Sequence, residues 1–224
     1  MILLNKKIVL GSGSPRRQLL LKELGLNFRI LISDTPEIPI PGLFGGKIAE
    51  YLSDEKADAL KNKIYEDEIL ITADTIVWLN SSMLNKPTDS NAAFKMLSSL
   101  SGCKHQVFTG VTIINATLKK TFYVESSVVF KTLNESEIRN YISEFKPFDK
   151  AGSYGAQECL SEGINPLSEK EIQFIKKYNL ENFFERTLAP EKKKHIQMID
   201  HIEGSYYNVM GLPIVELVEE LVSF

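Results

Sequence analysis

The segment GSGSPRR, at positions 11–17, combines residue types that can bind an anion. A glycine–serine turn before a helix exposes backbone N–H groups, and the helix dipole adds positive potential there. Arginines at that end disfavour the helix by roughly 0.3 kcal/mol or more, whereas a bound anion reverses the effect, and guanidinium groups suit phosphate. Two solvent-facing arginines beside an ordinary turn are the alternative. The residues expected to contact a polyanion are Ser12, Gly13, Ser14, Arg16 and Arg17.

Asp74 lies inside the apolar segment ITADTIVWL, where an unpaired carboxylate is costly. It needs a cation, a metal ion or several N–H donors, and backbone N–H groups at a strand end are the structural alternative. Lys86 precedes Pro87 in a turn that follows the same segment. A carboxylate and a lysine on either side of one hairpin can hold a Mg²⁺–phosphate group, although a turn lysine commonly faces solvent.

Two further polar side chains fit a nucleotide site. Ile48, Leu52 and Lys56 are spaced four residues apart, so on a helix they share one stripe with the Lys56 ammonium at its edge. That ammonium points into a cleft or reaches out to water. Gln157, in the loop DKAGSYGAQE, carries a donor and an acceptor on one amide, which suits the edge of a pyrimidine base. A loop glutamine is otherwise solvated.

Composition narrows the class of protein. The chain has 224 residues, of which 43% are apolar and 25% charged, which is typical of a globular domain. The net charge of −3 gives no basic field, so no nucleic-acid partner is expected. Cys103 and Cys159 form no C-x-x-C pair, which indicates a reduced protein. Without a signal-peptide pattern or an apolar run of roughly 18 residues, we expect a cytoplasmic protein with no membrane partner.

Hydrophobic periodicity predicts strands that alternate with helices. The expected strands are 7–13, 27–33, 68–79, 105–114 and 121–133, and the expected helices are 14–24, 47–63, 88–100, 134–145 and 212–224. Asp74 and Thr75 are expected to interrupt the third strand. The helix at 88–100 is expected to be capped near Thr88, and Pro213 to lie in the first turn of the last helix. This order predicts an α/β fold with a mixed sheet.

The segment 164–200 breaks this alternation because it is rich in charge and has helical periodicity. Ser168 and Glu171 have the spacing of a capping box. We expect a helical insertion in a single domain that spans 1–224. The run EKKKH at 191–195 is interpreted as a solvated face, with a nucleic-acid patch as the second reading.

Taken together, the segments resemble the Maf family of nucleoside triphosphate pyrophosphatases, also called septum formation inhibitor proteins. The matching segments, in the family's order, are LGSGSPRRQLLLKELG, YLSDEKADAL, ADTIVWLNSSMLNKPTDSNAAFKMLSSLSGCKHQVFTGV, DKAGSYGAQ and IEGSYYNVMGLPI. The resemblance implies a cytoplasmic enzyme that splits a nucleoside triphosphate into monophosphate and pyrophosphate. It also implies a divalent metal such as Mg²⁺, Mn²⁺ or Co²⁺, a homodimer, and a two-lobed, inosine-triphosphatase-like sheet bent around a deep cleft.

The resemblance also implies roles for individual residues. Asp74 corresponds to the proton acceptor and is a candidate metal ligand. The residues matched to base choice are Arg16, Thr75 and Gln157, and those matched to the phosphates are Arg17, Lys56 and Lys86. SPRR followed by YGAQ is similar to the branch that acts on dTTP and UTP.

The chain departs from the family pattern at two places. Many relatives have a D-E pair after the second strand, whereas the nearest acids here are Asp34 and Glu37, which leaves that role open between them. The insertion at 164–200 is also longer than usual. Two other classes remain: a nucleotidyltransferase, for which Lys22 follows the arginine pair, and a non-catalytic nucleotide-binding regulator of cell division.

Overall fold

The computed structural model describes residues 6–38, 40–161, 163–180, 182–188 and 196–224. Within these ranges seven strands form one sheet in the order β2-β1-β3-β5-β6-β7, and β4 pairs with β3. The strands are β1 (Lys7–Leu10), β2 (Phe28–Ile30), β3 (Glu68–Leu79), β4 (Ser82–Leu84), β5 (Lys104–Ile114), β6 (Lys119–Phe130) and β7 (Ile199–Glu203). β1 is parallel to β2 and β3, and the other pairings are antiparallel, which confirms the predicted mixed α/β fold.

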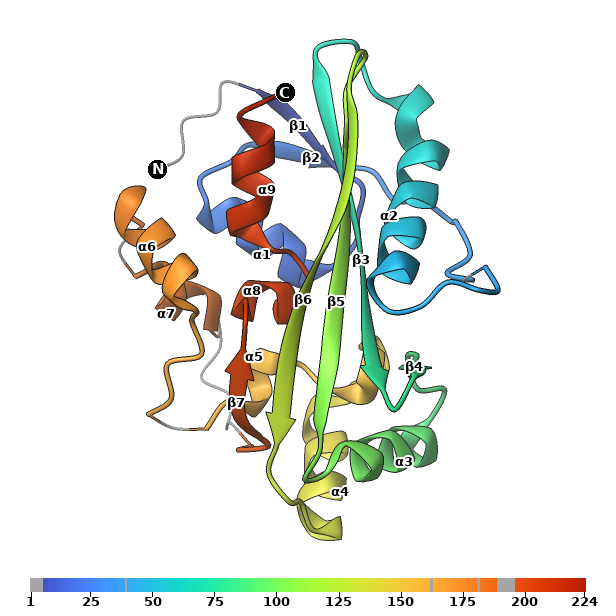
Figure 1. The fold of residues 1–224 in the computed structure, drawn as a ribbon, viewed down its shortest axis with the longest axis vertical. Coiled ribbons are helices and arrows are strands. Elements are labelled where there is room, and N and C mark those ends of the chain that lie inside the picture. Colours follow the sequence, from blue (N-terminus) through green and yellow to red (C-terminus); the bar gives the residue numbers. More distant parts are fainter. Residues whose placement is uncertain (1–5, 39, 162, 181, 189–195) are drawn as a thin grey trace.

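Helices cover both faces of the long strands β3, β5 and β6 (Figure 1). The α-helices are α1 (Pro15–Glu23), α2 (Gly46–Leu60), α3 (Ser90–Leu100), α4 (Glu135–Phe145), α5 (Ala156–Cys159), α6 (Glu169–Lys177), α7 (Phe183–Leu188), α8 (Tyr206–Met210) and α9 (Ile214–Leu221). Two short 3₁₀ turns lie at Lys61–Lys63 and Ala151–Ser153. No helix in the described ranges is long and apolar enough to cross a bilayer.

The alternation of side chains along β3 separates two layers of core. Ile76 packs with Ile48 and Leu52 of α2. Ile71 and Val77, which have the opposite parity, belong to the larger core that includes α1, α8 and α9. Because successive strand residues point to opposite faces, neighbouring residues of β3 reach α2 on one side and the main core on the other.

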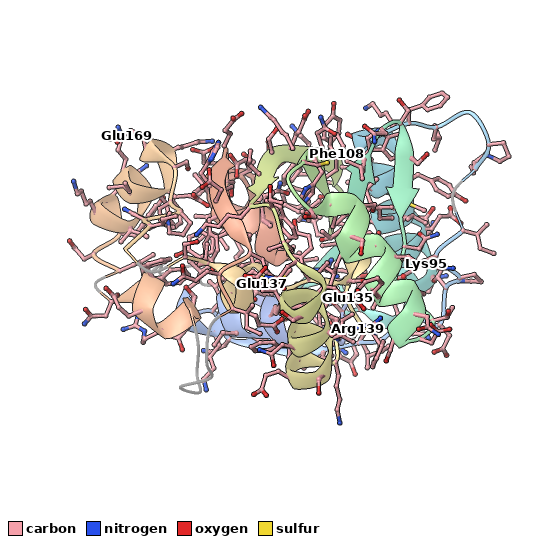
Figure 2. The ribbon with its side chains drawn as sticks, turned by 90° about the horizontal axis from the view of Figure 1, so that it is seen from below. Lys95, Phe108, Glu135, Glu137, Arg139 and Glu169 are labelled. Carbon is pink, nitrogen blue, oxygen red and sulfur yellow. The ribbon has the colours of Figure 1, made fainter. Side chains whose placement is uncertain are left out.

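The helices α3 and α4 lie far from the helix α6. α3 and α4 pack together at one end of the sheet (Figure 1). There the Arg139 guanidinium lies 4.5 Å from the centre of the Phe94 ring and binds Glu135 one turn away at 2.7 Å. Figure 2 shows Glu169, at the start of α6, on the opposite side of the molecule from Lys95 of α3. Of the two helices in 164–200, α6 therefore lies beside α9 and α7 beside α1, away from α3.

Three details of the sequence prediction concern β3, α3 and α9. β3 runs without interruption through Asp74 and Thr75, so the predicted break is wrong, because β5 pairs with both residues. The cap of α3 lies near Thr88, as predicted: Asp89 accepts a hydrogen bond from Ala92 N at 2.8 Å. Pro213 is the N-cap of α9 and not a residue of its first turn.

The segment 164–200 contains α6 and α7, but its last two residues begin strand β7. The capping box is confirmed, since Ser168 accepts a bond from Glu171 N and Glu171 accepts one from Ser168 N. The basic run at 191–195 lies outside the described residues.

Gly110 sets how closely α2 approaches the sheet. It lies opposite Asp74 in the β3–β5 register. A Cβ atom at position 110 would lie 2.1 Å from the carbonyl oxygen of Ala49 and 2.5 Å from Glu50 N, both in the backbone of α2. The absence of a side chain therefore lets α2, which carries Lys56, lie against the strand that carries Asp74.

We expect Gly110→Ala to lower the free energy of unfolding by about 2 kcal/mol, because backbone of α2 must move to admit the methyl group. Urea denaturation with an unchanged m-value measures this loss. Gly163→Ala is the matched control: its φ is +77° and its Cβ would meet no atom within 4 Å, so only backbone strain of about 1 kcal/mol is added. Equal losses in the two variants would contradict the close-approach argument.

Candidate active site

A cavity of about 360 Å³ opens beside the middle of β3. On this edge of β3, β1 pairs with 68–71 and β4 pairs with 77–79. The cavity is lined by residues that follow β1, by Asp74 and Thr75 between the two pairings, and by Lys86 after β4. The site therefore uses a stretch of strand edge that lies between two pairing partners.

Asp74 and Thr75 reach this cavity from opposite faces of β3. Asp74 shares the parity of Ile76 and accepts a hydrogen bond from the Nζ of Lys56 on α2. Thr75 points to the other layer, where its Oγ1 lies 2.9 Å from Thr109 Oγ1 on β5. An exposed strand edge is accessible from both faces, so neighbouring residues can serve one site.

Glu37 joins two lysines that are distant in sequence. Lys56 Nζ donates to Glu37 Oε1 at 2.8 Å as well as to Asp74. Lys86 Nζ donates to Glu37 Oε2 at 2.5 Å. The Lys56 side chain is 13% exposed and that of Lys86 is 50% exposed, so the network runs from the floor of the cavity to its rim.

Arg17 ties three segments together at the other wall. Its Nε donates to the carbonyl oxygen of Gly211 at 2.7 Å, its Nη1 to Ser12 Oγ at 3.1 Å, and its Nη2 to Thr75 Oγ1 at 3.0 Å. The guanidinium is buried, which lowers the pKa of Arg17. Arg17 lines the cavity. Each of its terminal nitrogens has a second N–H that these three bonds do not use.

Burial and neighbouring charges shift the pKa values of Asp74 and Glu37 in opposite directions. Burial raises the pKa of Asp74 above its ordinary value of 3.8, while the Lys56 ammonium opposes the rise and the Glu37 carboxylate adds to it. Burial would also raise the pKa of Glu37, but Lys56 and Lys86 outweigh it and lower that pKa to about 2. Glu37 is thus held as a carboxylate, whereas Asp74 is the better proton acceptor of the pair.

The cavity brings together every expected site residue except Gln157. The expected residues that line it are Ser12, Gly13, Ser14, Arg16, Arg17, Lys56, Asp74, Thr75 and Lys86. Gln157, on α5, lines a neighbouring cavity of about 610 Å³. Arg16 and Pro15 line both cavities, so the two spaces lie on either side of the start of α1.

The Ser12–Ser14 turn is held by its own hydrogen bonds. Ser14 N donates to Ser12 Oγ at 3.2 Å, and that oxygen also accepts from Arg17. Gln18 Nε2 donates to the carbonyl oxygen of Gly13 at 3.2 Å. The Ser14 N–H is therefore already engaged, in contrast to the outward-pointing donor that the sequence predicts.

Two further charged residues of the cavity carried no role in the sequence analysis. Asp149 and Lys150 also line the cavity, and the Lys150 side chain is only 11% exposed. Lys150 Nζ lies 2.9 Å from Asp149 Oδ1 and 3.5 Å from Glu158 Oε1. Both residues belong to the quoted DKAGSYGAQE segment, so an acid–base pair next to the glycines was the signal that could have found them.

Two acids of the cavity offer the kind of oxygen ligand that a divalent cation takes. Asp74 and Glu37 present carboxylate oxygens to one space and are bridged by one ammonium group. Mg²⁺ takes oxygen ligands and is commonly held by one or two carboxylates together with water and phosphate oxygens. The donor chemistry of Asp74 and Glu37 therefore fits a cation that brings further oxygen ligands with it. Asp34 does not line the cavity, whereas Glu37 does.

The fold and the cavity define a mixed α/β protein with a cationic pocket at a strand edge, and the comparisons identify its family. Residues 7–172 match the Maf-like protein family, so the chain belongs to that family. This confirms the resemblance drawn from the sequence segments.

Similar proteins extend over nearly the whole chain. A dTTP/UTP pyrophosphatase of Bacteroides thetaiotaomicron is 39% identical over 96% of this chain and 94% of its own. A dTTP/UTP pyrophosphatase of Flavobacterium johnsoniae is 36% identical over 96% and 93%. Among solved structures, the Staphylococcus aureus Ham1 protein aligns with a TM-score of 0.39 and 17% identity over 56% of this chain and 72% of that protein.

The causes of the pKa shift of Asp74 predict that two substitutions change this pKa in opposite directions. Glu37→Gln removes a negative charge and should lower the pKa of Asp74, whereas Lys56→Met removes its cationic partner and should raise that pKa further. Titration of the Asp74 side-chain carboxyl by ¹³C NMR measures both. Lys86→Met is the control, since Lys86 contacts Glu37 but not Asp74, and should move the Asp74 pKa least. Shifts of the same sign in the first two variants would contradict the network.

Proposed function

We propose that this protein is a nucleoside triphosphate pyrophosphatase that hydrolyses dTTP and UTP to the monophosphate and pyrophosphate. The observation that supports this proposal is that Arg16, Arg17, Lys56 and Lys86 line the same cavity as Asp74. The full-length similarity to dTTP/UTP pyrophosphatases supports the same assignment. A triphosphate is the kind of ligand that such a concentration of cations would hold.

In this proposal the chain's own groups divide the work by position. Lys86, at the rim, and Lys56, on the floor, bind the outer phosphates. The phosphates compete with Glu37 for these two ammonium groups. The remaining N–H groups of Arg17 meet the phosphate nearest the Ser12–Ser14 turn. Charge neutralisation and fixed orientation then supply most of the rate acceleration.

Asp74 acts as the general base in the proposed reaction. Its raised pKa lets the carboxylate accept a proton from a water molecule as the water oxygen bonds to the α-phosphorus. The bond from that phosphorus to the bridging oxygen breaks, and pyrophosphate leaves with the electron pair. Lys56 contacts Asp74 throughout and holds the carboxylate toward the cavity.

Glu37 would hold the divalent cation that the family resemblance implies. Asp74 is the alternative ligand, because metal ligand and general base are competing roles for that carboxylate. Mg²⁺, Mn²⁺ or Co²⁺ bound there would neutralise phosphate charge and polarise the reacting phosphoryl group. Glu37 takes the role of the second acid in this proposal, because it lines the cavity with Asp74. A homodimer and a cytoplasmic location, which the resemblance also implies, belong to the proposal as well.

The bond that breaks can be identified with isotopic water. We expect dTTP and UTP, incubated with the protein and Mg²⁺, Mn²⁺ or Co²⁺ in H₂¹⁸O, to give monophosphate that contains ¹⁸O and unlabelled pyrophosphate. A panel of the common triphosphates and 7-methyl-GTP establishes the preferred base. Release of a nucleoside diphosphate and inorganic phosphate would overturn the proposal. Nucleotide binding without hydrolysis in the presence of each metal would also overturn it.

Asp74→Asn is the matched variant in this assay, because it keeps the shape of the side chain and removes the base. It should bind nucleotide and lose turnover by on the order of 10²-fold or more. Binding is measured by isothermal titration with a non-hydrolysable dTTP analogue. Near-normal turnover in this variant would remove Asp74 from the mechanism while leaving the overall reaction in place.

Gln157 tests the choice of base. The thymine or uracil edge offers a ring N–H beside a carbonyl, which a glutamine amide can match and an ionised glutamate cannot. We expect Gln157→Glu to lower kcat/KM for dTTP and UTP by about 10-fold or more, with a smaller loss for a nucleotide whose base offers an amino group. Asn27→Asp, which adds the same charge at an exposed position of the same neighbouring cavity, is the control. Equal losses for all bases would contradict the base-edge role.

A further inference from the structure

Glu171 is an unusual residue of the insertion because its carboxylate is fully buried. It lies on α6 and is 1% exposed. Its Oε2 accepts from Ser168 N and Ser168 Oγ, both at 2.8 Å, as the capping box of α6 requires. A capping box on a surface helix needs no buried acid, so the remaining contacts of Glu171 call for a separate explanation.

Those contacts reach the short helix α8 in the core. Glu171 Oε1 accepts from Ser205 Oγ at 2.7 Å and from Tyr207 N at 3.0 Å. Its Oε2 also accepts from Tyr206 N at 3.2 Å. One carboxylate therefore satisfies the first N–H donors of α8 as well as those of α6, and it fixes the two helices relative to each other.

The far end of α8 reaches the active site through Gly211. Gly211 follows Met210, the last residue of α8, with a left-handed φ of +108°. Its carbonyl oxygen accepts the bond from Arg17 Nε at 2.7 Å. The position of α8 along its own axis therefore decides where the Arg17 guanidinium is held.

A second route runs through the middle of α8. Asn208 is fully buried, and its Oδ1 accepts from Thr109 N at 3.1 Å. Thr109 Oγ1 donates to the Asn208 carbonyl oxygen at 2.9 Å and lies 2.9 Å from Thr75 Oγ1. Thr75 in turn accepts from Arg17. Both routes from α8 thus converge on the Arg17–Thr75 pair.

We infer that Glu171 is a positioning residue for the catalytic cavity, and that the insertion holds α8 so that Gly211 and Asn208 orient Arg17 and Thr75. The inference rests on the roles proposed above for those two residues. It gives the insertion a role in the site although, among the described residues, none of 163–180 and 182–188 lines the principal cavity.

The test is a double-mutant cycle on kcat/KM for dTTP, with Arg17→Lys as the second substitution. Glu171→Gln replaces one accepting oxygen by a donor that faces other donors, so kcat/KM should fall by about 10-fold or more in protein that circular dichroism shows to be folded. If Glu171 acts through Arg17, the double variant is little worse than Arg17→Lys alone. Losses that multiply would overturn the inference, as would full activity of Glu171→Gln.

Two further variants separate positioning from general destabilisation. Lys170→Ala, on the same helix, removes exposed ion pairs of 2.9 and 3.1 Å to Glu216 and Glu219 of α9 and should keep normal kcat/KM. Ser205→Ala removes one bond to Glu171 and should give a smaller loss that is again masked by Arg17→Lys. Loss of activity in Lys170→Ala equal to that in Glu171→Gln would overturn the inference.

The cycle also distinguishes this inference from the proposed function. Normal turnover by Arg17→Lys would overturn the inference, because Glu171 would have no catalytic partner to orient. Pyrophosphate release by the unsubstituted protein would stand unaffected in that case. Absence of pyrophosphate release from the unsubstituted protein would instead overturn the proposed function.

Discussion

The burial of one carboxylate, Asp74, is the constraint on which the site depends. Its side chain is 8% exposed in the middle of an apolar strand, where an uncompensated charge would cost several kcal/mol. Lys56 supplies the compensation from α2, and this is possible because Gly110 lets α2 lie against the sheet. The ionisation of Asp74 therefore depends on how closely α2 packs against the sheet.

Sequence reasoning predicted the parts of this arrangement that are local. Strands such as β3 and β5 were found because their apolar runs are long, and the turn after β1 was found because glycine, serine and arginine adjoin there. Strand β7 was missed because it is five residues long and only Ile199 is buried in it, so IDHIE carries no strong apolar pattern. A pattern read over few residues cannot show an edge strand that pairs with β6 at long range.

The contacts of Arg17 could not have been predicted, because they join residues far apart in the chain. Arg17 and Gly211 are 194 residues apart, and Arg17 and Thr75 are 58 apart. Arg17 lines the cavity, but its type alone suggested either a phosphate ligand or a solvent-facing arginine beside a turn. Burial turns the same guanidinium into a link between β3, the turn after β1 and the end of α8.

The partners of the cations decide how a polyanion would meet them. Lys56 and Lys86 are already neutralised by Asp74 and Glu37, so phosphate must compete with carboxylates for those ammonium groups. The hydrogen-bond partners of Arg17 described here are a carbonyl and two hydroxyl groups, which leave its full charge uncompensated by direct contact. The strongest attraction for an anion inside the cavity therefore comes from Arg17. Its guanidinium is hydrogen-bonded to Gly211, at the end of α8.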